Sequence, residues 1–109
     1  MSHWKWTMPR VRVTTIDLLT PGTLAHVEAA GHPVAICNNN GAIHAFHGLC
    51  PHQGAPLGQG NLAEGHIVCP WHAWAFNCKT GKFDFNPAIR IEKYPVAVED
   101  GQVCVDIPD

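Results

Sequence analysis

The chain has 109 residues, of which 46% are hydrophobic and only 15% are charged. This length predicts a single domain, residues 1–109, because a chain of this size buries one modest core. A formal net charge of −2 argues against the strongly basic surface that nucleic-acid binding requires, so no nucleic-acid partner is expected. No apolar run of about eighteen residues is present, which predicts that no segment spans a membrane.

The N-terminus and the cysteine content predict the cellular compartment. The first nine residues lack the apolar stretch of an export signal. Five cysteines are an odd number, which argues against a closed disulfide framework and agrees with a reducing environment. We therefore expect a soluble, cytoplasmic protein.

The first half of the chain reads as short strands with tight turns. Alternation over Arg10–Val13 predicts a half-buried strand, and residues 16–21 predict one short helical turn. Residues 33–37 read as a strand. Asn40-Gly41 is a strong hairpin signal that leads into a strand over residues 42–46.

The second half continues this pattern. Strands are expected around residues 66–69 and 73–76, and residues 89–92 also alternate. Asp100-Gly101 predicts a second hairpin, which joins residues 96–98 to residues 103–107. Short strands without long helical periodicity predict an all-β sandwich or small barrel with antiparallel strands.

Two short pairs of metal-binding residues stand out: Cys50 with His52, and Cys69 with His72. Sixteen residues separate the pairs. Structural zinc sites also use two cysteines and two histidines, but they usually keep like ligands together, with at least two residues inside each pair. The order Cys-His followed by Cys-His instead fits two metals, each receiving one ligand from each loop.

The residues around these pairs resemble the Rieske [2Fe–2S] family closely. The resemblance is carried by Cys50-Pro51-His52-Gln53-Gly54-Ala55-Pro56-Leu57 and by Cys69-Pro70-Trp71-His72-Ala73-Trp74-Ala75-Phe76. It runs from about His44 to the C-terminus and includes Asn86-Pro87-Ala88, which looks like the family's third loop. It implies one Rieske-type cluster with Cys50 and Cys69 on one iron and His52 and His72 on the other. It also implies an all-β base that carries a small cluster-binding subdomain, about 45–86.

The resemblance further implies a low reduction potential. High-potential members carry a disulfide and two hydroxyl groups near the cluster. The matching positions here are Ala55 and Trp71 for the disulfide, and Trp74 and Phe76 for the hydroxyl groups. Because hydrogen bonds to cluster sulfurs stabilise the reduced state, their loss lowers the potential. We expect a value of roughly −150 mV, at the low end of the family's range.

By the same resemblance, the chain is an electron-transfer protein without catalytic residues of its own. It looks like the ferredoxin component of bacterial ring-hydroxylating dioxygenase systems. Its expected partners are a flavoprotein ferredoxin reductase that oxidises NAD(P)H and a terminal oxygenase, and it is expected to be a monomer. The alternative is the small subunit of an NADH-dependent nitrite reductase, which resembles the same family.

The remaining cysteines and histidines are expected to have structural roles. Cys37, Cys78 and Cys104 read as small buried hydrophobic residues. Cys78 lies near the second pair, but a ligand role for it would leave one histidine without a metal. His47 precedes Cys50 by three positions and is expected to pack against the first loop.

Overall fold

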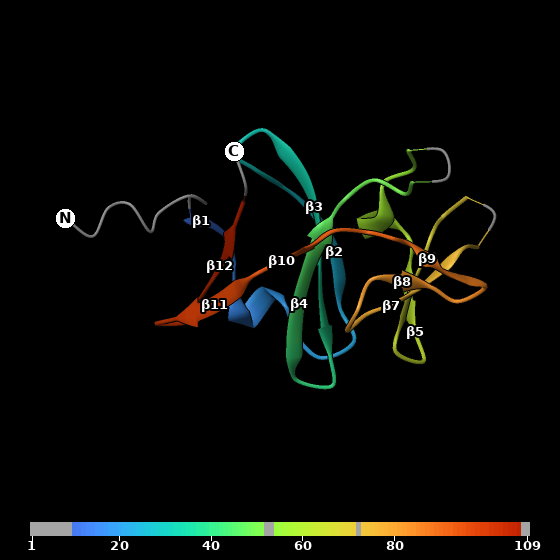
Figure 1. Cartoon of the computed structure of the whole chain (residues 1–109). Coiled ribbons are helices and arrows are strands. Elements are labelled where there is room, and N and C mark those ends of the chain that lie inside the picture. The colour runs from blue at the N-terminus through green and yellow to red at the C-terminus, as the bar shows by residue number, and fades with distance from the viewer. Residues whose placement is uncertain (1–9, 52–53, 72, 108–109) are drawn as a thin grey trace.

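The computed structural model describes residues 10–51, 54–71 and 73–107. Within these ranges the chain consists of short strands and two 3-10 helices, η2 and η3 (Figure 1). In chain order the elements are β1 (Arg10–Thr15), η2 (Ile16–Leu18), β2 (Leu24–Ala29), β3 (His32–Asn39), β4 (Ala42–His47), η3 (Leu57–Gln59), β5 (Asn61–Ala63), β6 (His66–Val68), β7 (Ala75–Asn77), β8 (Lys82–Phe83), β9 (Asn86–Arg90), β10 (Lys93–Tyr94), β11 (Val96–Glu99) and β12 (Gln102–Asp106).

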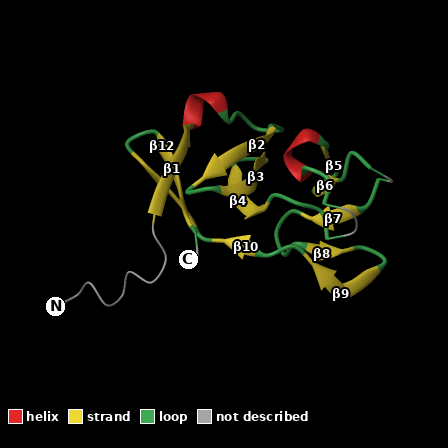
Figure 2. Ribbon diagram, turned by 90° about the horizontal axis from the view of Figure 1, so that it is seen from above, coloured by secondary structure: helices red, strands yellow, loops and turns green. Residues whose placement is uncertain are grey.

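The strands form three antiparallel sheets. A three-stranded sheet has the order β1-β12-β11, and a four-stranded sheet has the order β10-β4-β3-β2. These two sheets form the base of the molecule. The third sheet, β5-β6-β7-β8-β9, lies at the opposite end of the molecule from β1 and β12 (Figure 2). This architecture confirms the predicted all-β fold.

The four-stranded sheet is buried on both faces, and β3 shows why. Its central residues, Val34, Ala35, Ile36 and Cys37, are all fully buried. Because successive side chains of a strand point to opposite faces, Val34 and Ile36 enter one core while Ala35 and Cys37 enter another. A continuous apolar run is the sequence expected for a strand covered on both sides.

One core fills the base, and the second joins the base to the five-stranded sheet. The base core combines residues of β3 and β4 with Val103 and Val105 of β12. The second core includes Phe46 of β4, Ile67 of β6 and Phe76 of β7. The five-stranded sheet is therefore not an appendage, because it shares a packed interior with β3 and β4.

Both predicted hairpins are confirmed. Asn40 and Gly41 have φ values of 53° and 97°, and Asp100 and Gly101 have values of 52° and 76°. Two successive positive φ values are the geometry of the turn that joins tightly paired antiparallel strands. β3 pairs with β4 across the first turn, and β11 pairs with β12 across the second.

Two expectations about local structure need correction. The predicted strand over residues 89–92 lies earlier in the chain, because β9 spans Asn86–Arg90. Ile91 turns into the second core and donates its N–H to the carbonyl of Gly81 at 2.9 Å. The predicted helical turn is one 3-10 turn, Ile16–Leu18. Neither short helix in the described ranges is long or apolar enough to cross a membrane. The single-domain limits and the subdomain at about 45–86 stay predictions.

Candidate metal centre

The first predicted ligand, Cys50, lies in a closed turn that follows β4. Its N–H donates to the carbonyl of Ala55 at 2.8 Å, and its carbonyl accepts the N–H of Gly54 at 2.7 Å. Gly54 has φ of 74°, a conformation that glycine adopts without a steric penalty. Because the turn closes on itself, the Cys50 residue is held almost completely buried, with 2% of its surface exposed.

The second loop repeats this closure. The N–H of Cys69 donates to the carbonyl of Trp74 at 2.7 Å, again five positions later in the chain. Ala73 has φ of 55°, which is uncommon for a residue with a Cβ and costs roughly 1–2 kcal/mol. A strained backbone of this kind persists where the surrounding structure fixes it, and such positions cluster at functional sites.

The two cysteines belong to the same buried core and have chemistry suited to a metal. Each carries a thiol, and Cys69 is about as buried as Cys50, with 3% of its surface exposed. The Sγ of Cys69 accepts a hydrogen bond from the N–H of Trp71 at 3.4 Å. A backbone N–H directed at a sulfur stabilises the negative charge of a thiolate ligand.

The two predicted histidine ligands, His52 and His72, lie outside the described residues. His47 and His66, which the structure does describe, have other partners. The Nδ1 of His47 lies 3.3 Å from the hydroxyl of Tyr94. His66 lies 2.9 Å from the carbonyl of Glu64 and 2.9 Å from a carboxylate oxygen of Asp84.

Within the described ranges alone, no group of three or more His, Cys, Asp or Glu side chains is arranged to hold a metal. The ligand set Cys50, His52, Cys69 and His72 therefore stays a prediction.

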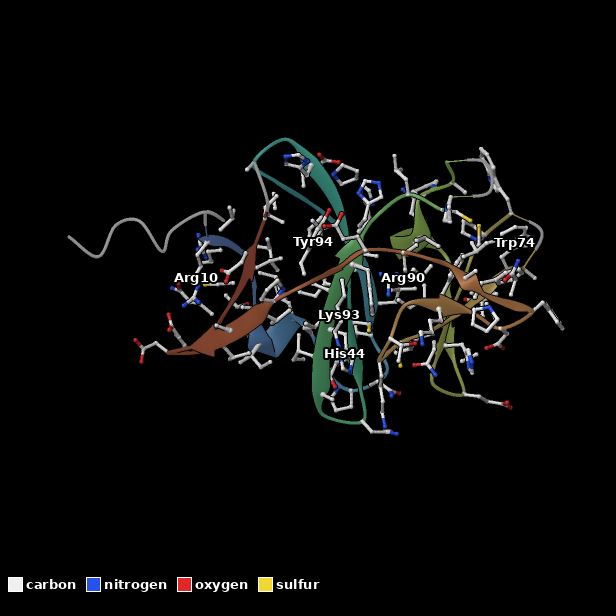
Figure 3. The ribbon with its side chains drawn as sticks, in the orientation of Figure 1. Arg10, His44, Trp74, Arg90, Lys93 and Tyr94 are labelled. Carbon is white, nitrogen blue, oxygen red and sulfur yellow. The ribbon has the colours of Figure 1, made fainter. Side chains whose placement is uncertain are left out.

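An aromatic cluster supports the second loop, and sequence reasoning missed it. The ring of Trp74 stacks on Phe83, with centroids 4.1 Å apart and planes 8° from parallel. Phe83 also contacts Phe76 at 5.6 Å and the edge of Phe85 at 5.8 Å. Trp74, labelled in Figure 3, thus links the backbone of Cys69 to the side chains of β8. The sequence signal was the run of aromatic residues at alternate positions, Phe83 and Phe85.

The other three cysteines were expected to be buried hydrophobic residues. Cys37 and Cys78 are buried, which confirms the expectation for them. Burial, with a smaller effect from Cys78, raises the pKa of Cys37 to about 12. Burial also raises the pKa of Cys78. Cys104 is only half-buried, because it lies on the outer face of β12.

A depression of about 550 Å³ opens beside the first loop. Its lining residues come from that loop and from the connection between β9 and β10: His47, Leu49, Cys50, Pro51, Gly54, Arg90, Ile91 and Glu92. Cys50 and Arg90 therefore face the same hollow. Of the residues in and beside the two ligand loops, Ala55 and Leu57 are fully buried, Leu49 is half-buried, and Pro51 and Trp71 are exposed.

The model of the Rieske [2Fe–2S] domain matches residues 9–95, which is most of the chain. The chain belongs to the Rieske [2Fe–2S] family. Its cofactor is therefore a Rieske-type [2Fe–2S] cluster. Two buried thiols at the closed turns of two loops, one of them accepting a backbone N–H, fit the cysteine half of such a centre. The family match decides the choice between iron–sulfur and zinc.

Two proteins of oxygenase systems resemble this chain over most of its length. The ferredoxin component of the alkene monooxygenase system of Xanthobacter autotrophicus is 34% identical, over 87% of this chain and 79% of its own length. A chain in the solved complex of reduced oxygenase and oxidised ferredoxin of carbazole 1,9a-dioxygenase is 29% identical. The match has a TM-score of 0.82 and covers 92% of this chain and 94% of that one.

Two other similar proteins restrict what can be concluded about function from similarity alone. This chain matches apoptosis-inducing factor 3 of mouse at 36% identity but spans only 14% of that protein's length. A putative NADH-dependent nitrite reductase small subunit of Mycobacterium tuberculosis is 24% identical, with a TM-score of 0.81 over 90% of this chain and 94% of that one. At that identity the likeness shows a shared fold alone.

Proposed function

We propose that this chain is a one-electron carrier with a low-potential Rieske cluster, which accepts electrons from a flavoprotein NAD(P)H reductase and donates them to a terminal oxygenase. The observation that carries the proposal is the extent of the likeness to ferredoxins. Both ferredoxin relatives are matched over most of their own length, and one of them was solved together with its oxygenase.

We assign Cys50 and Cys69 to one iron and His52 and His72 to the other. When bound, the cluster takes up and releases one electron at a time. The buried thiols keep water from the cysteine side of the site. The loop tips remain accessible, since Pro51 and Trp71 are exposed. An electron carrier needs this combination, because its redox centre must be protected and yet lie close to a partner.

The alternative, the small subunit of a nitrite reductase, has weaker support. The likeness to such a subunit is at the level of fold. The relative with higher identity over a similar share of this chain is a ferredoxin component. Stable co-purification with a large siroheme subunit would favour the nitrite reductase assignment over the carrier.

Anaerobic reduction tests the proposed function directly. Purified, cluster-loaded protein is mixed with NADH and a catalytic amount of a flavoprotein reductase from a dioxygenase system, and the visible absorbance of the cluster is followed. We expect the cluster to be reduced by one electron per chain and to be reoxidised when a Rieske-type terminal oxygenase is added. A protein that several such reductases leave oxidised, although dithionite reduces it, would contradict the proposal.

A further inference from the structure

Four basic residues lie on neighbouring segments of the fold, from the end of β7 to β10 of the base. Lys79, Lys82, Arg90 and Lys93 are four of the chain's seven lysines and arginines, and all four are exposed. We call them the basic face. They follow or belong to four different strands, β7, β8, β9 and β10. The fold therefore concentrates positive charge in a protein whose net charge is −2.

The basic face keeps like charges together at a cost in stability. Lys82 and Arg90 are directly paired across β8 and β9, so their side chains lie on the same face of the sheet. Like charges directly opposite one another destabilise a sheet. The Nζ of Lys93 donates to the carbonyl of Lys79 at 2.6 Å and lies 6.0 Å from the centre of the Phe46 ring. That arrangement holds one ammonium group beside the backbone of another lysine.

Carboxylates do not neutralise this charge in the part of the chain that the structure describes. The ion pairs found there involve Arg10, His26 and His66, and none involves a residue of the basic face. The carboxylate of Asp84 lies 2.9 Å from the Nε2 of His66 and is not paired with a lysine or arginine in the described part of the chain. Glu92 is the one carboxylate that lines the two neighbouring depressions, and it lies between Arg90 and Lys93. The local balance remains positive.

The position of the basic face connects it to electron transfer. Arg90 lines the same depression as Cys50, and it also lines a second depression with Thr80 and Lys93. Figure 3 shows Arg90 and Lys93 along the strand connection that leads away from the ligand loops. An acidic surface placed on Arg90 would lie beside the first loop.

We propose that the basic face is the docking surface for an acidic patch on the protein that donates electrons to this carrier. This inference rests on the proposed function. The donor must bind the oxidised carrier and leave the reduced one. One-electron reduction adds one negative charge near the basic face, which weakens its attraction for an acidic partner. The charge arrangement thus favours binding of the donor before transfer and release after it.

A binding experiment tests the docking surface without any electron transfer. Oxidised, cluster-loaded protein is titrated with a poly-L-glutamate peptide at low ionic strength, and the dissociation constant is measured by calorimetry. We expect Arg90→Gln to weaken binding several-fold and Lys82→Gln with Arg90→Gln to weaken it further. Arg12→Gln is the matched control, because Arg12 is also an exposed arginine on a strand but lies in β1, outside the basic face. Equal losses in the Arg12 and Arg90 variants would overturn the proposal.

Two further measurements test the assignment to the donor. Reduced wild-type protein should bind the peptide more weakly than oxidised protein, and equal or tighter binding would overturn the assignment. In stopped-flow reduction, the ratio of the rate with anionic dithionite to the rate with cationic methyl viologen radical should fall several-fold in the double variant, with high salt removing the difference. An unchanged ratio would also overturn it. If reductases fail to reduce the protein while peptide binding persists, the proposed function fails and the basic face stands.

Discussion

Trp74 lies face to face with Phe83, and the same tryptophan accepts the backbone N–H of Cys69 through its carbonyl. The stack therefore supports a predicted ligand from the side of β8. We expect Phe83→Leu to lower the free energy of unfolding by about 1–2 kcal/mol, because it removes the ring contacts with Trp74, Phe76 and Phe85. Urea denaturation measures the change. Phe85→Leu is the control, since Phe85 is 89% exposed, and a larger loss there than at Phe83 would contradict this account.

Gly60 lies where the backbone leaves no room for a side chain. A Cβ at this position would lie 1.9 Å from the carbonyl oxygen of Val68, the residue before Cys69. We expect Gly60→Ala to lower the free energy of unfolding by about 3 kcal/mol or more, because β5 and β6 must separate to admit the methyl group. Gly65→Ala has open space and only a positive φ to overcome, so its cost should be about 1–2 kcal/mol. Thermal denaturation of both variants compares the two losses of stability. Equal losses would contradict this account, because they would mean that the backbone at Val68 moves aside with little loss of stability.

The predicted ligands differ from the other cysteines in their effect on metal content. We expect Cys69→Ala to lose both iron and acid-labile sulfide, because one iron loses a thiolate ligand. Cys78→Ala is the matched control: Cys78 is also a buried free thiol in the same core, and its removal should leave metal content unchanged. Elemental analysis and a sulfide assay distinguish the two variants. Zinc in place of iron and sulfide in the wild-type protein would refute the ligand assignment.

The reduction potential depends on the residues around the second loop. We expect a midpoint of roughly −150 mV. Phe76→Tyr should raise it, if its new hydroxyl donates to a cluster ligand as the resemblance implies, whereas His72→Cys should lower the potential or prevent assembly. A redox titration followed by visible absorbance measures all three proteins. A clearly positive midpoint for the wild type would contradict the interpretation of Trp74 and Phe76.

His44 predicts how stability changes with pH. Burial, followed by the charges of Lys93 and Lys79, lowers its pKa below the ordinary value of 6.5. Its Nε2 is buried without a hydrogen-bond partner among the described atoms. As the pH falls through 6.5, His44 therefore becomes protonated in the unfolded chain before it does so in the folded protein. The free energy of unfolding is for this reason highest above that pH and falls as the pH drops below it.

Denaturation at several pH values between about 5 and 7.5 tests this prediction. His44→Gln removes the titrating ring, so its stability should change less over this range than that of the wild type. If the two proteins lose stability in parallel, other groups cause the pH dependence.

Local sequence signals predicted the two hairpins, whose turns are Asn40-Gly41 and Asp100-Gly101, because such turns need residues that accept a positive φ. β2 was missed, since Leu24–Ala29 mixes apolar and polar residues without clear alternation and is a strand through its pairing with β3. Spacing and residue type predicted the two ligand loops. The basic face and the stack of Trp74 on Phe83 were not predicted, because their residues come from separate segments that only the tertiary fold brings together. The alternation of Phe83 and Phe85 was the one local signal of the aromatic cluster.

The pairing of β1 with β12 has a consequence for biosynthesis. Arg10 and Asp106, 96 positions apart, are hydrogen-bonded across these strands. The base sheet cannot close until β12 has been synthesised, which happens after both cysteine loops. Contacts of such long sequence separation slow folding. We therefore expect the base to close after the second core around Cys50 and Cys69, whose buried residues run only from Ala35 to Ile91.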